Sequence, residues 1–131
     1  YCATLNHNNP RKGFKAIALS VDTSFITAWS NDFGFEGIFE RQVETLGEEN
    51  DVLICYSTSG SSKNIIKAVI EAKRKNMHVL AFTGNSSNNE LSKLSDHSFI
   101  APSTQTALIQ EMHTIIGHEV CLAVEKLIAR E

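Results

Sequence analysis

Five hydroxyl-bearing residues and one glycine stand between an apolar run and a helical pattern in the middle of this chain. They occupy residues 57–62 and are Ser57, Thr58, Ser59, Gly60, Ser61 and Ser62. Glycine lets the backbone turn tightly, and the first N–H groups of the following helix have no acceptor within that helix. Since the helix dipole also places partial positive charge there, residues 57–62 predict an anion-binding loop. A phosphate group is the anion that fits it best.

Helix capping is the simpler interpretation of this segment, because Ser and Thr are favoured at the start of a helix. Five hydroxyl residues within six positions exceed what one cap requires, so we favour a ligand site. The chain has neither the Gly-Lys-Ser/Thr end of a Walker loop nor the glycine fingerprint of a dinucleotide site. We therefore expect no nucleotide cofactor. A loop of hydroxyls and backbone amides without a lysine suits a sugar phosphate better than a triphosphate with magnesium.

The composition is that of one globular domain spanning residues 1–131. The chain has 131 residues, 42% of them hydrophobic, and a formal net charge of -3, and this length is enough to bury a core. The mild negative charge argues against nucleic acid as a partner, and no apolar run approaches the roughly 20 residues of a membrane span. The cysteines Cys2, Cys55 and Cys121 are widely spaced, so we expect no disulfide framework and a reducing, cytoplasmic compartment. The first residue is Tyr1, and we expect an amino-terminal part of the natural protein to precede it.

Apolar runs of strand length alternate with helical patterns along the chain. The predicted strands are residues 16–19, 52–56, 79–82 and 98–101. The predicted helices are residues 23–31, 35–46, 63–75, 90–95 and 106–128. Such alternation implies parallel pairing, and hence an α/β fold of the flavodoxin-like kind, a three-layer α/β/α sandwich with a central parallel sheet.

Two features of this predicted sheet bear on the site. The run 52–56 is continuously apolar, which indicates a strand covered on both faces. Ligands in such folds lie beyond the carboxyl ends of the strands. We therefore expect the loop 57–62 and the pair Asn31-Asp32, which both follow predicted strands, to face one crevice.

Three motifs together resemble a known family. Residues 51–84, with the sequence Ser-Thr-Ser-Gly at 57–60, resemble a sugar isomerase (SIS) domain. With residues 30–35 (SNDFGF) and 109–113 (IQEMH), they resemble the phosphoheptose isomerase group of that family, from residue 14 onward. The resemblance implies conversion of sedoheptulose 7-phosphate into D-glycero-D-manno-heptose 7-phosphate, a step toward bacterial lipopolysaccharide and capsule. It also implies a homotetramer whose active sites are shared between subunits.

The resemblance implies a set of site residues as well. The phosphate would be held by Ser57, Thr58, Ser59 and Ser62. The sugar would be contacted by Asn31, Asp32 and Gln110. Gln110 and His118 would stand at the reacting end, where some members of the family bind zinc (Zn2+).

The implied reaction needs a base that takes a carbon-bound proton and returns it one carbon away. Histidine suits this task by type, and His118 is the candidate. Gln110 and His118 are eight positions apart, about 12 Å along a helix and roughly 80° around its axis, so zinc would need further ligands. We interpret His113 as structural or interfacial. His7, His78 and His97 are interpreted as surface residues.

Two positions depart from the family pattern and keep other functions open. The family carries a glutamate on the helix before this chain's start, and our alignment puts it at or near Thr4. An acidic residue often precedes Gln110, where this chain has Ala107 and Leu108. The alternatives are a non-catalytic member, similar to the bacterial factor that binds the replication initiator DnaA, and a sugar-phosphate sensor. We also expect part of the apolar helix 106–128 to be a subunit contact.

Overall fold

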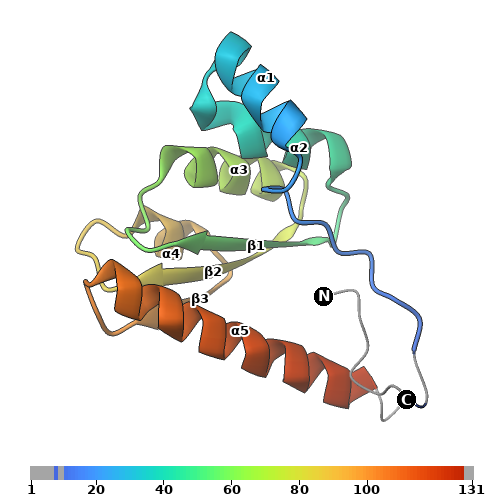
Figure 1. Cartoon of the computed structure of the whole chain (residues 1–131), viewed down its shortest axis with the longest axis vertical. Helices are drawn as coiled ribbons and strands as arrows, with labels where there is room; N and C mark the ends of the chain where they lie inside the picture. The colour runs from blue at the N-terminus through green and yellow to red at the C-terminus, as the bar shows by residue number, and fades with distance from the viewer. Residues whose placement is uncertain (1–7, 9–10, 129–131) are drawn as a thin grey trace.

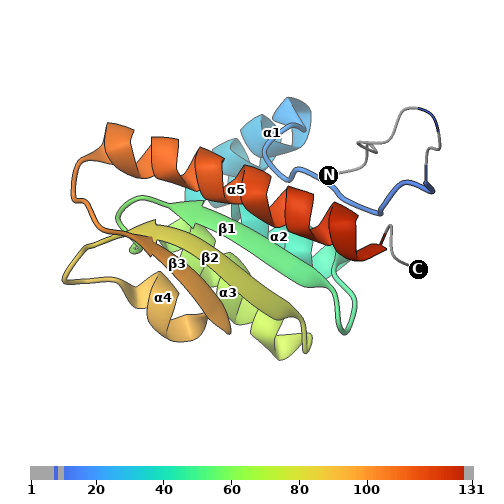
Figure 2. The same ribbon diagram turned by 90° about the horizontal axis from the view of Figure 1, so that it is seen from below.

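Three parallel strands form the centre of the described part of the chain, which comprises residue 8 and residues 11–128 of a computed structural model (Figure 1). They are β1 (Val52–Ser57), β2 (His78–Gly84) and β3 (His97–Ala101), in the order β1-β2-β3. Helices α3 (Lys63–Arg74) and α4 (Glu90–Leu94) cover one face of the sheet. Helix α5 (Thr106–Ile128) lies across the opposite face (Figure 2). The predicted α/β/α sandwich with a parallel sheet is confirmed.

The remaining helices form a layer on the far side of α3 from the sheet (Figure 1). They are α1 (Thr23–Phe33), the short 3-10 helix η1 (Phe35–Gly37) and α2 (Ile38–Leu46). Asp22 caps α1 by accepting the N–H of Phe25 at 3.0 Å. Gly34 ends α1 with φ +90°, a backbone conformation that favours glycine. The motif 30–35 is therefore a helix end followed by a tight turn.

The main core lies between the sheet and α3. Its buried members include Cys55, Val69, Ala72, Val79 and Leu91. Burial raises the pKa of the Cys55 thiol to about 12, because a thiolate is poorly solvated among apolar side chains. Cys55 therefore serves as a small apolar residue, as its strand context indicates.

The predicted strand at residues 16–19 is wrong. The segment has no strand conformation, and Ile17 is 69% exposed. Its one partly buried residue, Leu19, packs against the core and uses its carbonyl to accept the Gln42 side-chain amide at 3.0 Å. A strand persists only where a neighbouring strand supplies ladder hydrogen bonds, and the described residues place none beside this segment. Consequently Asn31 and Asp32 do not follow a strand but belong to the last turn of α1.

The expectation that β1 is covered on both faces is also wrong for the described residues. Val52, Ile54 and Tyr56 are 59%, 49% and 52% exposed. Helix α5 packs mainly on β2 and β3 and reaches β1 only near Tyr56. The continuous apolar run forms a strand, but the face of β1 on the α5 side is exposed to solvent in the described structure. No helix among the residues described is long and apolar enough to cross a membrane.

Asp96, just before β3, forms contacts with α3 and β2 that should make the stability of the fold depend on pH. Its carboxylate pairs with Lys73 and accepts the N–H of Val79 at 2.7 Å. The Lys73 hydrogen bond and then the Val79 N–H hold the pKa of Asp96 below its ordinary 3.8. A carboxyl with a lowered folded-state pKa contributes stability above its ordinary pKa, and this stability is lost as the pH falls through the lowered value.

We expect Asp96→Asn to lower the urea midpoint at neutral pH and to approach the unsubstituted protein as the pH falls below 3.8, because asparagine keeps the shape without the charge. Urea unfolding across this pH range measures the effect. Glu49→Gln, in the exposed turn before β1, is the charge-matched control and should follow the unsubstituted protein throughout. If the difference in urea midpoint between Asp96→Asn and the unsubstituted protein were the same at all pH values, the charge of Asp96 would not contribute to stability.

Candidate functional site

The loop 57–62, here called the serine loop, is closed by its own hydrogen bonds. The Gly60 N–H donates to the Ser57 hydroxyl and to the Ser57 carbonyl, each at 3.2 Å. The Ser57 and Ser62 hydroxyls are hydrogen-bonded at 2.9 Å. Ser59 accepts the N–H and the hydroxyl of Ser61, both at 3.3 Å. Ser57 is buried and organises the loop, whereas Ser59 is exposed and faces solvent.

The start of α3 keeps backbone donors available beside this loop. Ser62 is the N-cap residue, yet its side chain makes no capping hydrogen bond. The Ile65 N–H is satisfied by the Ser62 carbonyl and the Asn64 side chain. The N–H groups of Lys63 and Asn64 lie in the first turn of α3, where no helical carbonyl precedes them by one turn. They have no acceptor among the described residues. Simple capping therefore does not account for the serines, and the free donors suit an anion.

Gly60 is enclosed by the end of β2 and the start of α4. Its φ is +67°, and a Cβ there would lie 2.1 Å from Asn89 Oδ1 and 2.8 Å from Thr83 Oγ1. Asn89 is buried, caps α4 through the Ser92 N–H at 3.1 Å and donates to the Gly84 carbonyl at 3.0 Å. Asn89 is not among the site residues predicted from the sequence, although its position three residues before Ser92 is typical of an N-cap.

The first turns of α5 reach the same edge of the sheet as the serine loop. The Gly84 N–H donates to the Thr58 carbonyl at 3.2 Å. A Cβ on Gly84 would lie 2.4 Å from Ile109 Cδ1, so α5 packs directly on the end of β2. Gln110 follows Ile109 and is exposed. The structure thus brings Gln110 to the edge where the serine loop lies.

His118 lies further along α5, at the border of the open face of β1. A Cβ on its neighbour Gly117 would be 3.4 Å from the Tyr56 hydroxyl, and the His118 side chain is exposed. His113, one helical turn after Gln110, is buried against the rings of Tyr56 and Phe82, which agrees with a structural role.

Asn31 and Asp32 lie apart from this edge, in the layer beyond α3 (Figure 1). Both side chains are exposed, and the Asn31 amide donates to Asp32 at 2.8 Å. Their connection to the serine loop runs through η1, because Glu36 forms an ion pair with Lys63 at 3.1 Å. The expected crevice assumed that the serine loop and Asn31-Asp32 both follow strands. This assumption is wrong, because Asn31 and Asp32 belong to α1.

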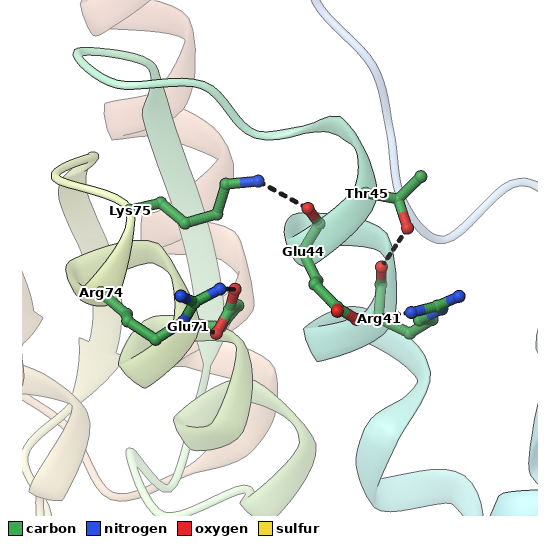
Figure 3. Close-up of polar contacts among 6 residues, drawn as sticks. All are labelled: Arg41, Glu44, Thr45, Glu71, Arg74 and Lys75. Carbon is green, nitrogen blue, oxygen red and sulfur yellow. Dashed lines mark hydrogen bonds and ion pairs between the residues drawn. The ribbon is translucent and has the colours of Figure 1, made fainter.

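A hollow of about 370 Å³ lies elsewhere, between α2 and α3. Two ion pairs line it, each within one helix: Arg41 with Glu44 at 2.7 Å and Arg74 with Glu71 at 2.6 Å; Figure 3 shows these residues. Lys75 bridges the helices by donating to the Glu44 carbonyl at 2.5 Å. This hollow is a solvated seam between helices rather than the site that the sequence predicts.

Comparison with known proteins identifies the family. The model of the SIS domain matches residues 9–84. This chain belongs to the SIS-domain family. It is 47% identical over 120 residues to a phosphoheptose isomerase of Campylobacter jejuni, covering 92% of this chain and 64% of that protein. It is 51% identical over 115 residues to the Burkholderia pseudomallei phosphoheptose isomerase, covering 88% and 58%.

Solved structures agree. The SIS domain aligns with the phosphoheptose isomerase from Neisseria gonorrhoeae at a TM-score of 0.82 and 40% identity, covering 85% of this chain and 61% of that one. It aligns with the phosphoheptose isomerase from Francisella tularensis at a TM-score of 0.86 and 38% identity. This alignment covers 95% of this chain and 65% of that one. The chain thus spans about three fifths of the length of these relatives.

The zinc prediction rests on two donors, Gln110 and His118, in the described part of the SIS domain. No group of three or more His, Cys, Asp or Glu side chains placed to hold a metal occurs among the described residues. A structural or catalytic zinc needs at least three protein ligands, so these residues alone do not fit the ion. Thr4, expected from the sequence to lie at or near the position of the family glutamate, is outside the described residues, as are Cys2 and His7.

The enclosure of Gly60 predicts a large cost for a single methyl group. We expect Gly60→Ala to lower the free energy of unfolding by about 1–3 kcal/mol more than Gly34→Ala, as measured by urea denaturation. Both glycines have positive φ, but a Cβ at Gly34 meets nothing within 4 Å, so Gly34→Ala carries a backbone penalty without crowding. Equal losses would show that the Asn89 contact does not constrain the serine loop.

Proposed function

We propose that this SIS domain is part of an aldose–ketose isomerase that binds a sugar phosphate with its serine loop. The observation that supports this proposal most directly is the preformed loop beside the free N–H groups of Lys63 and Asn64. A phosphate at this point would receive backbone donors, exposed hydroxyls and the positive end of the α3 dipole together. The relatives described above bear the name phosphoheptose isomerase, which supports sedoheptulose 7-phosphate as the substrate.

The hydroxyls divide into two roles in this proposal. Ser59 is exposed and would contact the phosphate directly, together with Thr58 and Ser62, which are partly buried. Ser57 is buried, accepts the Gly60 N–H and bonds Ser62, so it would hold the loop in its binding shape as well as face the ligand. Asn31 and Asp32 would contact the sugar.

At the end of the sugar distant from the phosphate, the proposed chemistry is proton transfer between neighbouring carbons. His118 would remove a proton from C1 of the ketose and return it to C2, which gives the aldose. The intermediate carries negative charge on an enediolate oxygen, and the Gln110 amide would donate a hydrogen bond to it. Gln110 lies at the same sheet edge as the serine loop, which supports a place for it in the substrate site.

We also propose the homotetramer with shared active sites. Apolar side chains are exposed on α5 and on β1: Ile115 is 61%, Leu127 64% and Ile54 49% exposed. Exposed apolar surface of this kind is typical of protein interfaces. A cytoplasmic location belongs to the same proposal, and it is supported by Cys55 and Cys121, which are both free thiols in the structure.

The phosphate assignment predicts a loss of affinity on removal of one exposed hydroxyl. We expect Ser59→Ala to weaken binding of sedoheptulose 7-phosphate by about 10-fold or more, because a hydrogen bond to a charged group contributes about 1.5–3 kcal/mol. Isothermal titration calorimetry of the full-length protein measures this affinity. Ser98→Ala, an exposed serine on β3, should bind as the unsubstituted protein does. Unchanged affinity in Ser59→Ala would contradict the phosphate site.

The base assignment predicts a loss of turnover with binding retained. His118→Gln keeps a polar side chain but cannot take up a proton, so we expect kcat to fall about 10²–10⁴-fold while the Kd for the sugar phosphate changes little. Aldose formation followed by NMR gives the rate. His97→Gln, at an exposed position on β3, should retain full activity. Absence of turnover in the unsubstituted full-length protein, with sugar phosphate still bound, would favour the non-catalytic alternatives.

A further inference from the structure

Lys63 is the first residue of α3 and directly follows the serine loop, for which the sequence predicted no lysine. Side chains on a helix lean toward its amino terminus, and the flexible four-carbon stem of Lys63 lets its ammonium turn toward the loop that precedes it. Its side chain is 78% exposed and holds one ion pair, with Glu36 Oε1 at 3.1 Å. A solvent-exposed cation is thus carried by the residue whose own backbone N–H is one of the donors of the anion site.

The placement of Lys63 is unfavourable for the helix itself. A positive charge in the first turn opposes the helix dipole, and α3 has no acidic residue in that turn. The compensating carboxylate comes from another element, Glu36 of η1, which also pairs with Lys67 at 3.3 Å. Hydrogen bonds from Lys63 and then Lys67 lower the pKa of Glu36. Glu36 therefore stays charged and holds one lysine beside the loop and one a helical turn away.

We propose that Lys63 is a further phosphate-binding residue, and that Glu36 competes with the phosphate for its ammonium. This inference rests on the function proposed above. When the phosphate binds, Lys63 leaves Glu36 and pairs with the phosphate, while Lys67 keeps the Glu36 carboxylate neutralised. The exchange costs one exposed ion pair, which contributes little. It gains a pair with a phosphate monoester carrying between one and two negative charges at neutral pH.

Competition by Glu36 makes a prediction that a purely structural ion pair does not. Removing the Glu36 charge should free Lys63 and tighten phosphate binding, whereas loss of a structural contact between η1 and α3 would loosen the site. We expect Glu36→Gln to bind sedoheptulose 7-phosphate about two- to fivefold more tightly and Lys63→Gln about five- to tenfold more weakly. The double variant should match Lys63→Gln, because Glu36 then has no ammonium to withhold.

The experiment is calorimetric titration of the full-length protein and these variants with sedoheptulose 7-phosphate and, separately, with inorganic phosphate. The affinity ratios should agree for the two ligands, because Lys63 is assigned to the phosphate and not to the sugar. Lys93→Gln, which removes one exposed positive charge from α4, controls for net charge and should change either affinity less than twofold. Thermal unfolding of each variant establishes that it is folded.

Failure of this inference and failure of the proposed function give different results. If the unsubstituted protein binds sugar phosphate and Ser59→Ala weakens it, but Lys63→Gln binds as tightly as the unsubstituted protein, Lys63 has no role in binding and the inference is overturned. If Glu36→Gln binds less tightly, Glu36 does not compete for the Lys63 ammonium, and that part of the inference is overturned. If the unsubstituted protein binds neither ligand, the phosphate site itself is refuted, and the role of Lys63 with it.

Discussion

Two backbone hydrogen bonds hold the serine loop against the end of β2 and the start of α4. The Leu91 N–H donates to the Gly60 carbonyl at 2.8 Å, and the Gly84 N–H donates to the Thr58 carbonyl at 3.2 Å. Both require glycines, because a Cβ at Gly60 would meet Asn89 and a Cβ at Gly84 would meet α5. The loop is therefore fixed before any ligand arrives, and a fixed site loses less conformational entropy when it binds.

The same close approach sets the position of α5 and of the residues proposed to act on the sugar. Ile109 rests on Gly84, which places Gln110 at the loop edge, and the helix then carries His118 past Tyr56 to the open face of β1. In the proposed homotetramer a neighbouring subunit would cover that face. Exclusion of water there would strengthen the electrostatic interactions of His118 with the reacting sugar, so assembly and chemistry would depend on one surface.

Local patterns in the sequence were sufficient for the strand–loop–helix unit that carries the anion site. The run 52–56 is apolar, the hydroxyls follow at once, and the apolar residues of α3 recur at helical spacing, so β1, the serine loop and α3 are all specified by neighbours in the chain. The fold class follows from the alternation of such units. The motifs at 57–60 and 109–113 also pointed to the family that the comparisons identify.

The sequence by itself thus determined β1 to β3, the helices, the parallel arrangement of the strands and the hydroxyl loop, because these depend on residues a few positions apart. Only the tertiary structure decided which segment found a partner. Residues 16–19 have strand-like composition but no neighbouring strand among the described residues, and one face of β1 lies beyond the reach of α5. Glu36 meets Lys63 across 27 positions, and Asn89 encloses Gly60 across 29. Such contacts form when separate elements pack, and no local pattern specifies which elements will meet.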